Sequence, residues 1–175
     1  MARVIAVANQ KGGVGKTTTA VNVGSCLAEA GYKTLLVDLD PQGNATTGVG
    51  IDPRTLHSSM YQVLLGQKTI EETIIETSMQ RLFVVPSNLD LAGAEIELVS
   101  VFSRELRLRN AIAVVQDKYD YVIIDCPPSL GILTINGLAA AEEVIIPVQC
   151  EYYALEGLGQ LLNNVKLIQQ NLNKD

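Results

Sequence analysis

Apolar runs and amphipathic stretches alternate along the chain. Short runs in which almost every residue is apolar predict strands that are buried on both faces. The predicted strands are Val4–Ala8, Thr34–Leu39, Leu82–Val85, Tyr121–Ile124 and Val144–Val148. Stretches with apolar residues three or four positions apart predict the helices between them. The predicted helices are Thr17–Ala30, Ser59–Gly66, Thr69–Thr77, two within Leu89–Gln116, Gly131–Ala141 and Ala154–Leu172.

Small and polar residues mark where these elements end. Gly31 suits the left-handed position that follows a helix, and Ser103 is expected to cap the second helix within Leu89–Gln116. The segment from Asp40 to about Pro53 is rich in Gly, Asn and Thr and predicts a loop. One apolar stripe is expected along the last helix. It comprises Leu155, Leu158, Leu162, Val165, Ile168 and Leu172.

The alternation of strands and helices predicts an α/β fold, a mostly parallel β-sheet flanked by helices on both faces in three layers. Ligands bind such sheets beyond the carboxyl ends of the strands. We therefore expect the chemistry directly after the predicted strands. Their last residues are Ala8, Leu39, Val85, Ile124 and Val148.

Composition excludes several classes of protein. The chain has 175 residues, of which 47% are hydrophobic and 18% charged, so it is not intrinsically disordered. This length predicts one domain, residues 1–175. The net charge of −6 argues against a strongly basic nucleic-acid module. Three cysteines without CxxC spacing favour a reducing compartment. No run reaches the roughly 18 apolar residues of a membrane span, so we expect a cytoplasmic protein without membrane contact.

The segment between the first predicted strand and helix has the composition of a phosphate cradle. Gly15, Lys16 and Thr17 match the end of the pattern G-x-x-x-x-G-K-[ST], whereas Gln10 occupies its first glycine position. Glycines let backbone amides surround an anion, and the helix that follows adds its positive end. Lys16 is placed to neutralise β- and γ-phosphates, and the Thr17 hydroxyl to ligate Mg²⁺. A glycine-rich turn without a ligand is the structural alternative.

Two further predicted strands end in aspartates. Asp38 and Asp40 follow the second strand, and Asp40 stands where a carboxylate can hold an attacking water or join a Mg²⁺ shell. For Asp38, a structural hydrogen-bonding role and a nucleotide role are both open. Asp125 ends an apolar strand, the Walker B pattern, and is expected to hold Mg²⁺ through a bound water. Taken alone, such an aspartate is usually a turn former.

The complete loop resembles a known signature. The run Lys11, Gly12, Gly13, Val14, Gly15, Lys16, Thr17 and Thr18 is similar to the deviant Walker A box of the ParA/MinD family of P-loop ATPases. This resemblance implies that these residues bind ATP. It also implies that Lys11 reaches the partner's nucleotide across an ATP-dependent homodimer, and that Asp40, before Pro41 and Gln42, is essential for hydrolysis. Without the resemblance, Lys11 would be read as a solvated surface lysine.

Other segments resemble chromosomal ParA (Soj) proteins. These segments are 40–48, 91–98, 125–131 and 147–157. The resemblance implies an ATP-dependent switch for chromosome or plasmid segregation that a ParB-type partner stimulates. Relatives continue beyond the position of Asp175 with a strand, adenine contacts and basic residues that bind DNA nonspecifically, so we expect the chain to be shorter at its C-terminus than the family.

The sequence leaves three alternative functions open. A MinD-like, membrane-recruited ATPase for division-site placement shares the P-loop but requires an amphipathic anchor. An electron-transfer iron protein of the nitrogenase-reductase type also has a deviant P-loop and requires cluster-binding cysteines, which Cys126 does not obviously supply. A binding-only regulator would hold nucleotide without turnover.

Overall fold

The computed structural model describes residues 1–150 and 154–173, with the side chains of 154–156 left out. Within these residues, six strands form one sheet in the order β3-β4-β2-β5-β1-β6. The strands are β1 (Arg3–Val7), β2 (Thr34–Asp38), β3 (Ile75–Glu76), β4 (Leu82–Val85), β5 (Tyr121–Asp125) and β6 (Glu143–Ile145). All neighbouring pairs are parallel except β3 with β4, so the carboxyl ends of five strands meet at one edge.

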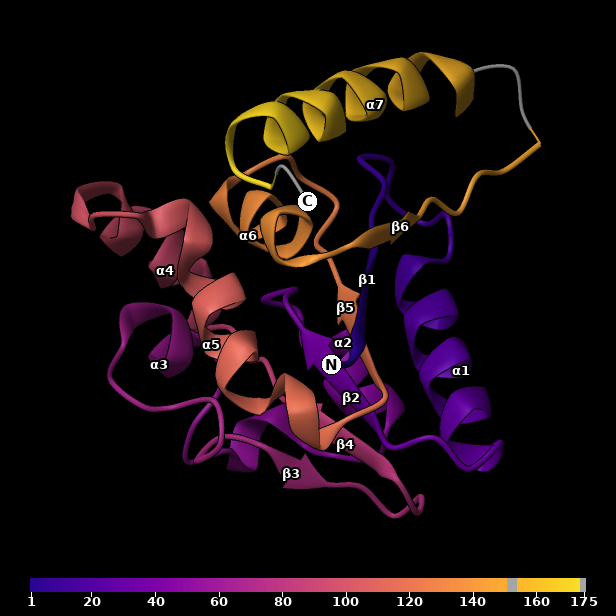
Figure 1. The fold of residues 1–175 in the computed structure, drawn as a ribbon, viewed down its shortest axis with the longest axis vertical. Helices are drawn as coiled ribbons and strands as arrows, with labels where there is room; N and C mark the ends of the chain where they lie inside the picture. The colour runs from indigo at the N-terminus through magenta and orange to yellow at the C-terminus, as the bar shows by residue number, and fades with distance from the viewer. Residues whose placement is uncertain (151–153, 174–175) are drawn as a thin grey trace.

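Helices cover both faces of this sheet (Figure 1). The α-helices in the described part of the chain are α1 (Lys16–Glu29), α2 (Asn44–Gly48), α3 (Met60–Leu65), α4 (Leu91–Glu97), α5 (Arg107–Val115), α6 (Ile132–Ala140) and α7 (Ala154–Asn171). Short 3₁₀ turns occupy 53–55, 98–100, 104–106 and 116–118. Helix α1 lies on one face, whereas α3, α4, α5 and α6 lie on the other (Figure 1).

Strand alternation builds a separate core on each face. In β2, Leu36 faces the α1 side, whereas Leu35 and Val37 face the opposite side. In β5, Ile123 and Ile124 divide in the same way, and both are fully buried. Because successive side chains of a strand point to opposite faces, a strand covered on both sides has to be apolar throughout. The unbroken apolar runs of the sequence are thereby explained, and the predicted fold class is confirmed.

Helix α6 packs unusually close to the sheet. A Cβ built on Gly137 would lie 2.7 Å from Cys126 Sγ and 3.2 Å from Leu39 Cδ2, so no larger residue fits there without movement. The buried Asn136 side chain accepts a hydrogen bond from Leu108 N (3.1 Å) and donates one to Arg104 O (2.8 Å). These contacts fix the helix against both the sheet and the segment that leads into α5. They also fix the loop between β5 and α6.

Two element predictions are wrong because tertiary contacts outweigh local propensity. The expected loop after Asp40 contains helix α2, in which Thr46 donates to Asp38 Oδ2 (2.7 Å) and accepts from Ser87 N (2.9 Å). The expected helix Thr69–Thr77 is instead a turn that leads into β3, which pairs with β4 and forms the edge of the described sheet.

Three finer predictions also need correction. Ser103 adopts a left-handed φ of 53° and its side chain caps nothing, although the helical stretch does break there. Strand β6 ends at Ile145, short of the predicted Val148, because its pairing partner β1 ends at Val7. Along α7, Leu161 is fully buried and Leu162 is 50% exposed, so Leu161 belongs to the apolar stripe in place of Leu162. The Leu155 side chain lies outside the described residues.

Candidate functional site

The three loops that carry the predicted site residues emerge side by side. Strands β2, β5 and β1 are neighbours, and Asp125 is in register with both Asp38 and Val7. Just beyond the strands, Leu39 N donates to Asp125 O (3.0 Å) and Cys126 N donates to Val7 O (3.1 Å). The backbone therefore brings the P-loop, the aspartates after β2 and Asp125 to one place at the carboxyl edge of the sheet.

The loop between β1 and α1 presents backbone to open space. Gly13 and Gly15 have φ values of 74° and 91°, a region that glycine enters without strain. A Cβ built on Gly12, Gly13 or Gly15 would meet nothing within 4 Å. Helix α1 begins at Lys16 with Gly15 as its N-cap, and no side chain caps it and no acidic residue occupies its first turn. The positive end of α1 is therefore uncompensated, which suits an anion.

The Lys16 side chain is held inside the loop. It is 7% exposed, and its Nζ donates to the Lys11 carbonyl oxygen at 3.0 Å. Burial lowers the pKa of Lys16, while the nearby Asp125 and Asp40 carboxylates act in the opposite direction. A cation that is held by a backbone carbonyl of the loop, with two carboxylates nearby, is placed to bind a phosphate at the mouth of the loop.

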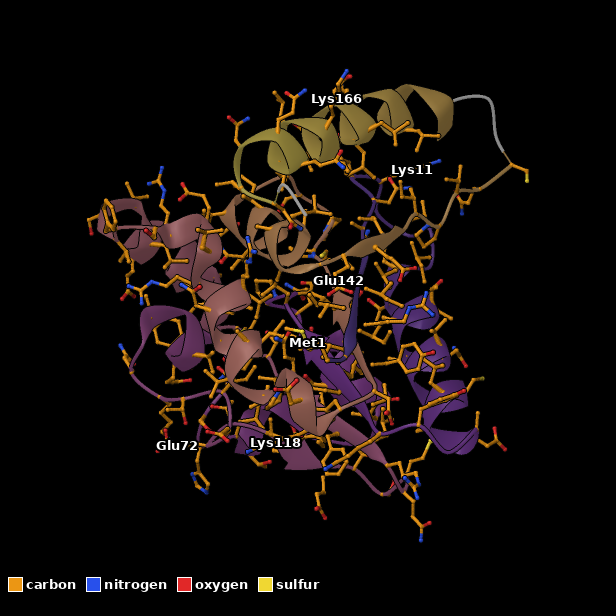
Figure 2. All side chains as sticks on the ribbon, viewed as in Figure 1. Met1, Lys11, Glu72, Lys118, Glu142 and Lys166 are labelled. Atoms are coloured by element: carbon orange, nitrogen blue, oxygen red, sulfur yellow. The ribbon has the colours of Figure 1, made fainter. Side chains whose placement is uncertain are left out.

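Lys11 lies on the outer side of the same loop. Its Nζ donates to Gln149 Oε1 at 3.3 Å, and Figure 2 shows it at the end of the molecule near α7, far from Lys118 and Glu72. Its backbone N–H donates to Asn9 Oδ1 at 3.0 Å. Lys11 and Lys16 thus project from one loop in different surroundings, one exposed and one buried.

Two residues outside the predicted set support this loop. Asn9 is 8% exposed and donates from Nδ2 to Pro147 O at 2.7 Å, while its Oδ1 receives Lys11 N. Gln149 Nε2 approaches Gly13 O at 3.5 Å. Together they tie the P-loop to the segment that follows β6. The polar residue directly after an apolar strand was the available signal for Asn9, whereas Gln149 was marked only by its place in the segment 147–157 that resembles chromosomal ParA proteins.

Asp125 is a buried carboxylate to which the described residues make no well-formed hydrogen bond. Both of its oxygens are inaccessible to solvent and neither has a hydrogen-bond partner among the described residues. Burial, together with the negative charges of Asp38 and Asp40, raises the pKa of Asp125 from 3.8 to about 7, although the nearby Thr17 hydroxyl and the charge of Lys16 act in the opposite direction. An unsatisfied buried carboxylate beside the P-loop is suited to a cation or to water bound by one.

Asp38 and Asp40 have different surroundings. Asp38 is fully buried and accepts hydrogen bonds from Asp40 N, Thr46 N and Thr46 Oγ1, so its contacts are those of a structural residue. Burial raises the pKa of Asp38 to about 6 despite these bonds. Asp40 is 8% exposed, and among the described residues its carboxylate accepts a hydrogen bond from Gln42 N alone, at 2.9 Å to Oδ1. Asp40 therefore keeps acceptor capacity for another group.

The residues at this edge fit a magnesium–nucleotide better than a metal alone. Among the described residues, no group of three or more His, Cys, Asp or Glu side chains could hold a metal ion. Mg²⁺ usually keeps several waters and binds through one or two carboxylates plus substrate phosphates. Asp125 with its orphaned oxygens, the neighbouring Thr17 and the open amide loop meet that description.

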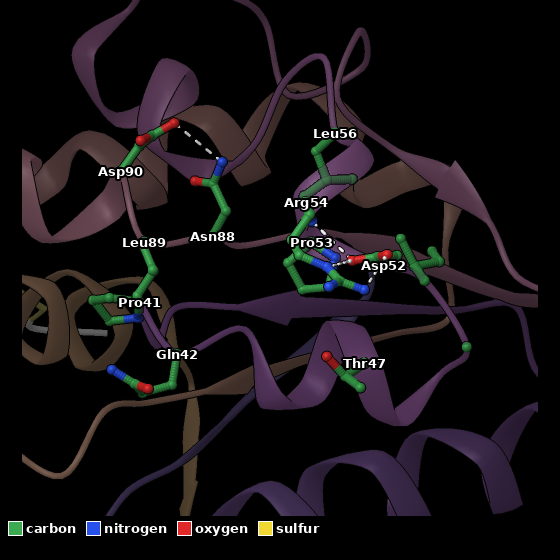
Figure 3. Close-up of a pocket in the computed structure, with 12 residues that line it drawn as sticks. Pro41, Gln42, Thr47, Asp52, Pro53, Arg54, Leu56, Asn88, Leu89 and Asp90 are labelled. Atoms are coloured by element: carbon green, nitrogen blue, oxygen red, sulfur yellow. Dashed lines mark hydrogen bonds and ion pairs between the residues drawn. The ribbon is translucent and has the colours of Figure 1, made fainter.

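A separate pocket lies beside the Asp40 loop (Figure 3). Its volume is about 920 Å³, and its walls come from Pro41 and Gln42, the segment 47–56 and the segment 88–90. Within it, Arg54 pairs with Asp52, and Asn88 donates to Asp90 Oδ2. None of the P-loop residues lines this pocket, so it is distinct from the phosphate cradle.

The cysteines and the helices bear on the alternative functions. Cys126 is buried, and burial raises the pKa of its thiol, so it is a poor metal ligand. Cys26 and Cys150 are exposed. In the part of the chain that the structure describes, no helix combines the length and the apolar character required to cross a bilayer.

Comparisons with known proteins agree with this geometry. A family model described as an AAA domain matches residues 2–175. The sporulation initiation inhibitor protein Soj of Bacillus subtilis is 57% identical over all 175 residues, and these cover 69% of its length. The chromosome partitioning protein ParA of Myxococcus xanthus is 55% identical over 173 residues, which cover 61% of it. The chain thus spans about two thirds of the length of these relatives.

Solved structures give the same fold. A Mycobacterium smegmatis protein named cobyrinic acid a,c-diamide synthase, solved with an ATP analogue and magnesium, is 49% identical with a TM-score of 0.96. The match covers 100% of this chain and 71% of that protein. A plasmid partition protein of Borrelia burgdorferi is 30% identical with a TM-score of 0.86, over 97% of this chain and 75% of its own. The predicted mostly parallel, helix-flanked sheet is common to all of them.

Proposed function

This chain belongs to the AAA-domain family that includes the Soj and ParA chromosome-partitioning proteins, and we propose that it is an ATPase switch for chromosome or plasmid segregation. The observation that carries the proposal is the juxtaposition at one sheet edge of an open amide loop, a buried lysine and a buried carboxylate to which no described residue makes a well-formed hydrogen bond. These are the groups that a triphosphate with its magnesium ion requires.

Each predicted site residue has a proposed role in this scheme. The backbone amides of Lys11, Gly12, Gly13, Val14, Gly15, Lys16, Thr17 and Thr18 surround the phosphates, and Lys16 Nζ exchanges its carbonyl partner for phosphate oxygens. Thr17, Asp40 and Asp125 hold Mg²⁺ directly or through water. Mg²⁺ supplies neutralisation of phosphate charge when it is bound. Asp40 orients the attacking water with its free acceptor capacity.

The partner interactions extend the proposal beyond one subunit. We infer that ATP brings two copies together and that Lys11, on the outer side of the loop, contacts the partner's nucleotide. A ParB-type protein would stimulate hydrolysis and reset the switch. Nonspecific DNA binding belongs to the longer relatives, since the chain itself carries a net charge of −6. Residues 1–175 would act as one P-loop domain of the bacterial cytoplasm, nucleoid-associated in the family.

The alternatives have less support. The relatives with the names Soj and ParA favour partition over a MinD-like, membrane-recruited role. The burial of Cys126 argues against an electron-transfer iron protein. A binding-only regulator differs from the proposed ATPase only in turnover, so it is the alternative that the experiment has to separate.

Nucleotide binding and phosphate release, measured on the parent chain and two variants, test the proposal. Lys16→Ala removes the cation of the cradle and should weaken ATP binding by at least about 100-fold. Asp40→Ala should leave binding within about threefold but lower the rate of phosphate release by at least about 100-fold. Unchanged ATP affinity in Lys16→Ala would contradict the proposed site. Tight binding without any phosphate release by the parent chain would favour the binding-only regulator.

A further inference from the structure

A chain of buried hydrogen bonds joins the Asp40 backbone to the loop that follows β4. Asp38 Oδ1 accepts from Asp40 N at 3.2 Å, and Asp38 Oδ2 accepts from Thr46 N at 2.8 Å and from Thr46 Oγ1 at 2.7 Å. Thr46 Oγ1 in turn accepts from Ser87 N at 2.9 Å. Asp38, Thr46 and Ser87 are all fully buried. We refer to these hydrogen bonds as the Thr46 network.

The Thr46 network requires a hydroxyl group at position 46. A backbone N–H can only donate, so the Thr46 oxygen accepts from Ser87 N and its single proton is left for Asp38. Valine has almost the same shape as threonine but can make neither bond, whereas serine can make both. Because the site is fully buried, bulk water does not replace a bond that is lost there.

The same network holds both ends of the Asp40 loop. Strands β2 and β4 are parallel neighbours, so the loops after them leave the sheet side by side. One oxygen of Asp38 holds the backbone at Asp40, and the other holds helix α2, which begins at Asn44. Between these points a Cβ built on Gly43 would lie 2.9 Å from Ser87 O, so the middle of the loop also rests against Ser87.

The Asp40 carboxylate depends on this loop for its position. Its Oδ1 accepts from Gln42 N at 2.9 Å, which is a bond within the same loop. The place of the carboxylate at the sheet edge is therefore set by where the loop backbone is held, and Asp38 and Thr46 hold it. The Thr46 network lies in the segments 38–46 and 87, apart from the phosphate cradle at 11–18, so its loss should move Asp40 and leave the cradle intact.

We propose that Thr46 is a positioning residue for hydrolysis: its hydroxyl bridges Asp38 and the loop after β4, and this bridge fixes the Asp40 carboxylate. The inference rests on the proposed function in taking Asp40 to orient the attacking water. Displacement of a reacting group by about 1 Å can lower a rate about 100-fold, so the loss of a remote hydrogen bond can have a large effect on turnover. A threonine that only stabilised the fold would lower the free energy of unfolding without a specific effect on turnover.

The test compares three variants by ATP affinity and by the rate of phosphate release at saturating ATP. Thr46→Val should lower that rate at least about tenfold and leave ATP affinity within about threefold, which also shows that the variant is folded. Thr46→Ser should restore the rate to within about threefold of the parent. Thr47→Val is the matched control, because the Thr47 hydroxyl donates to Gly43 O and its side chain lines the separate pocket of Figure 3. This control should leave the rate within about twofold.

A second background separates positioning from a general loss of structure. In Asp40→Ala, the added Thr46→Val substitution should have no further effect on phosphate release, because the position of an absent carboxylate no longer matters. An unchanged rate in Thr46→Val, or an equal loss in both backgrounds, would overturn the inference and leave the proposed ATPase standing.

Hydrogen exchange gives a readout that does not need turnover. The Asp40 amide should exchange at least about tenfold faster in Thr46→Val than in the parent, and at the parent's rate in Thr47→Val. A parent chain that binds ATP but releases no phosphate would contradict the proposed function, and the Asp40 amide would then decide on the positioning by itself. Unchanged exchange of this amide in Thr46→Val would overturn the inference.

Discussion

At the scale of single residues, the site depends on two aspartates that are buried where a charge is costly. Asp38 receives three hydrogen bonds, whereas no described residue makes a well-formed hydrogen bond to Asp125, yet burial raises the pKa of both carboxyl groups, to about 6 and about 7. The difference in hydrogen bonding assigns Asp38 to the structure of the α2 turn. It leaves Asp125 as the group that gains most from a cation or from solvent bound to one.

The raised pKa of Asp125 predicts an unusual pH dependence of stability. The carboxyl loses its proton near pH 3.8 in the unfolded chain but only near 7 in the folded one. Between these values the folded state binds more protons, so the free energy of unfolding should fall as the pH rises through this range. Asp125→Asn removes this term and should raise the free energy of unfolding at pH 8 by about 1–3 kcal/mol, with little effect at pH 4.

Urea unfolding at several pH values, with EDTA and without nucleotide, measures this effect. Asp38 should leave a smaller slope of the same sign in the variant, because its pKa is also raised. Asp117→Asn is the control, since that side chain is 81% exposed and the variant should keep the parent's slope. An Asp125→Asn variant with the full pH dependence of the parent would contradict the assignment.

At the scale of elements, the sequence predicts what depends on local patterning and fails where a distant contact decides. The strands at positions 4–8, 34–39 and 121–124 are confirmed within one residue. A short run in which almost every residue is apolar is stable in a folded protein mainly as a strand that is buried on both faces. Helix α2 and strand β3 were not predictable. The first depends on the hydrogen bonds of Thr46 to Asp38 and Ser87, and the second on pairing with β4.

The candidate site likewise has one part that sequence patterns predict and another part that depends on contacts between distant segments. The P-loop and the aspartates after β2 and β5 stand in sequence patterns that predict their chemistry, and the structure brings them to one edge. Asn9 and Gln149 support the loop through contacts with segments almost 140 positions away in the chain. The sequence contains no sign of that proximity until the order of β1 and β6 in the sheet is known.

Helix α7 offers a direct comparison between sequence pattern and structure. The pattern places Leu162 in the apolar stripe, whereas the structure buries Leu161 completely and leaves Leu162 50% exposed. Leu161→Ala should therefore lower the free energy of unfolding by about 2–4 kcal/mol, and Leu162→Ala by less than about 1 kcal/mol. The two substitutions have the same effect on helix propensity, so their difference in urea unfolding reports burial alone. Equal losses would mean that α7 is rotated from the described orientation.

At the scale of the whole molecule, one edge of the sheet joins both cores. The P-loop directly follows β1. This strand contributes Val7 to the core under α1 and Ala6 to the core on the other face of the sheet. Asp125 ends β5, which contributes to both cores in the same way. A ligand held between these two strand ends should therefore stabilise the molecule as a unit and not only the loop that contacts it.

This coupling gives the last prediction. A ligand that binds only the folded state at 100 times its Kd stabilises it by about 2.7 kcal/mol, and each further tenfold adds about 1.4 kcal/mol. Under the proposed function, ADP with Mg²⁺ should raise the free energy of unfolding by these amounts in the parent chain and not in Lys16→Ala. Hydrogen exchange should show the same gain for the slowest amides of β2 and β5, because these open only when both cores unfold together. A gain confined to the amides of β1 and α1 would show instead that the ligand stabilises its own loop while the rest of the sheet unfolds independently.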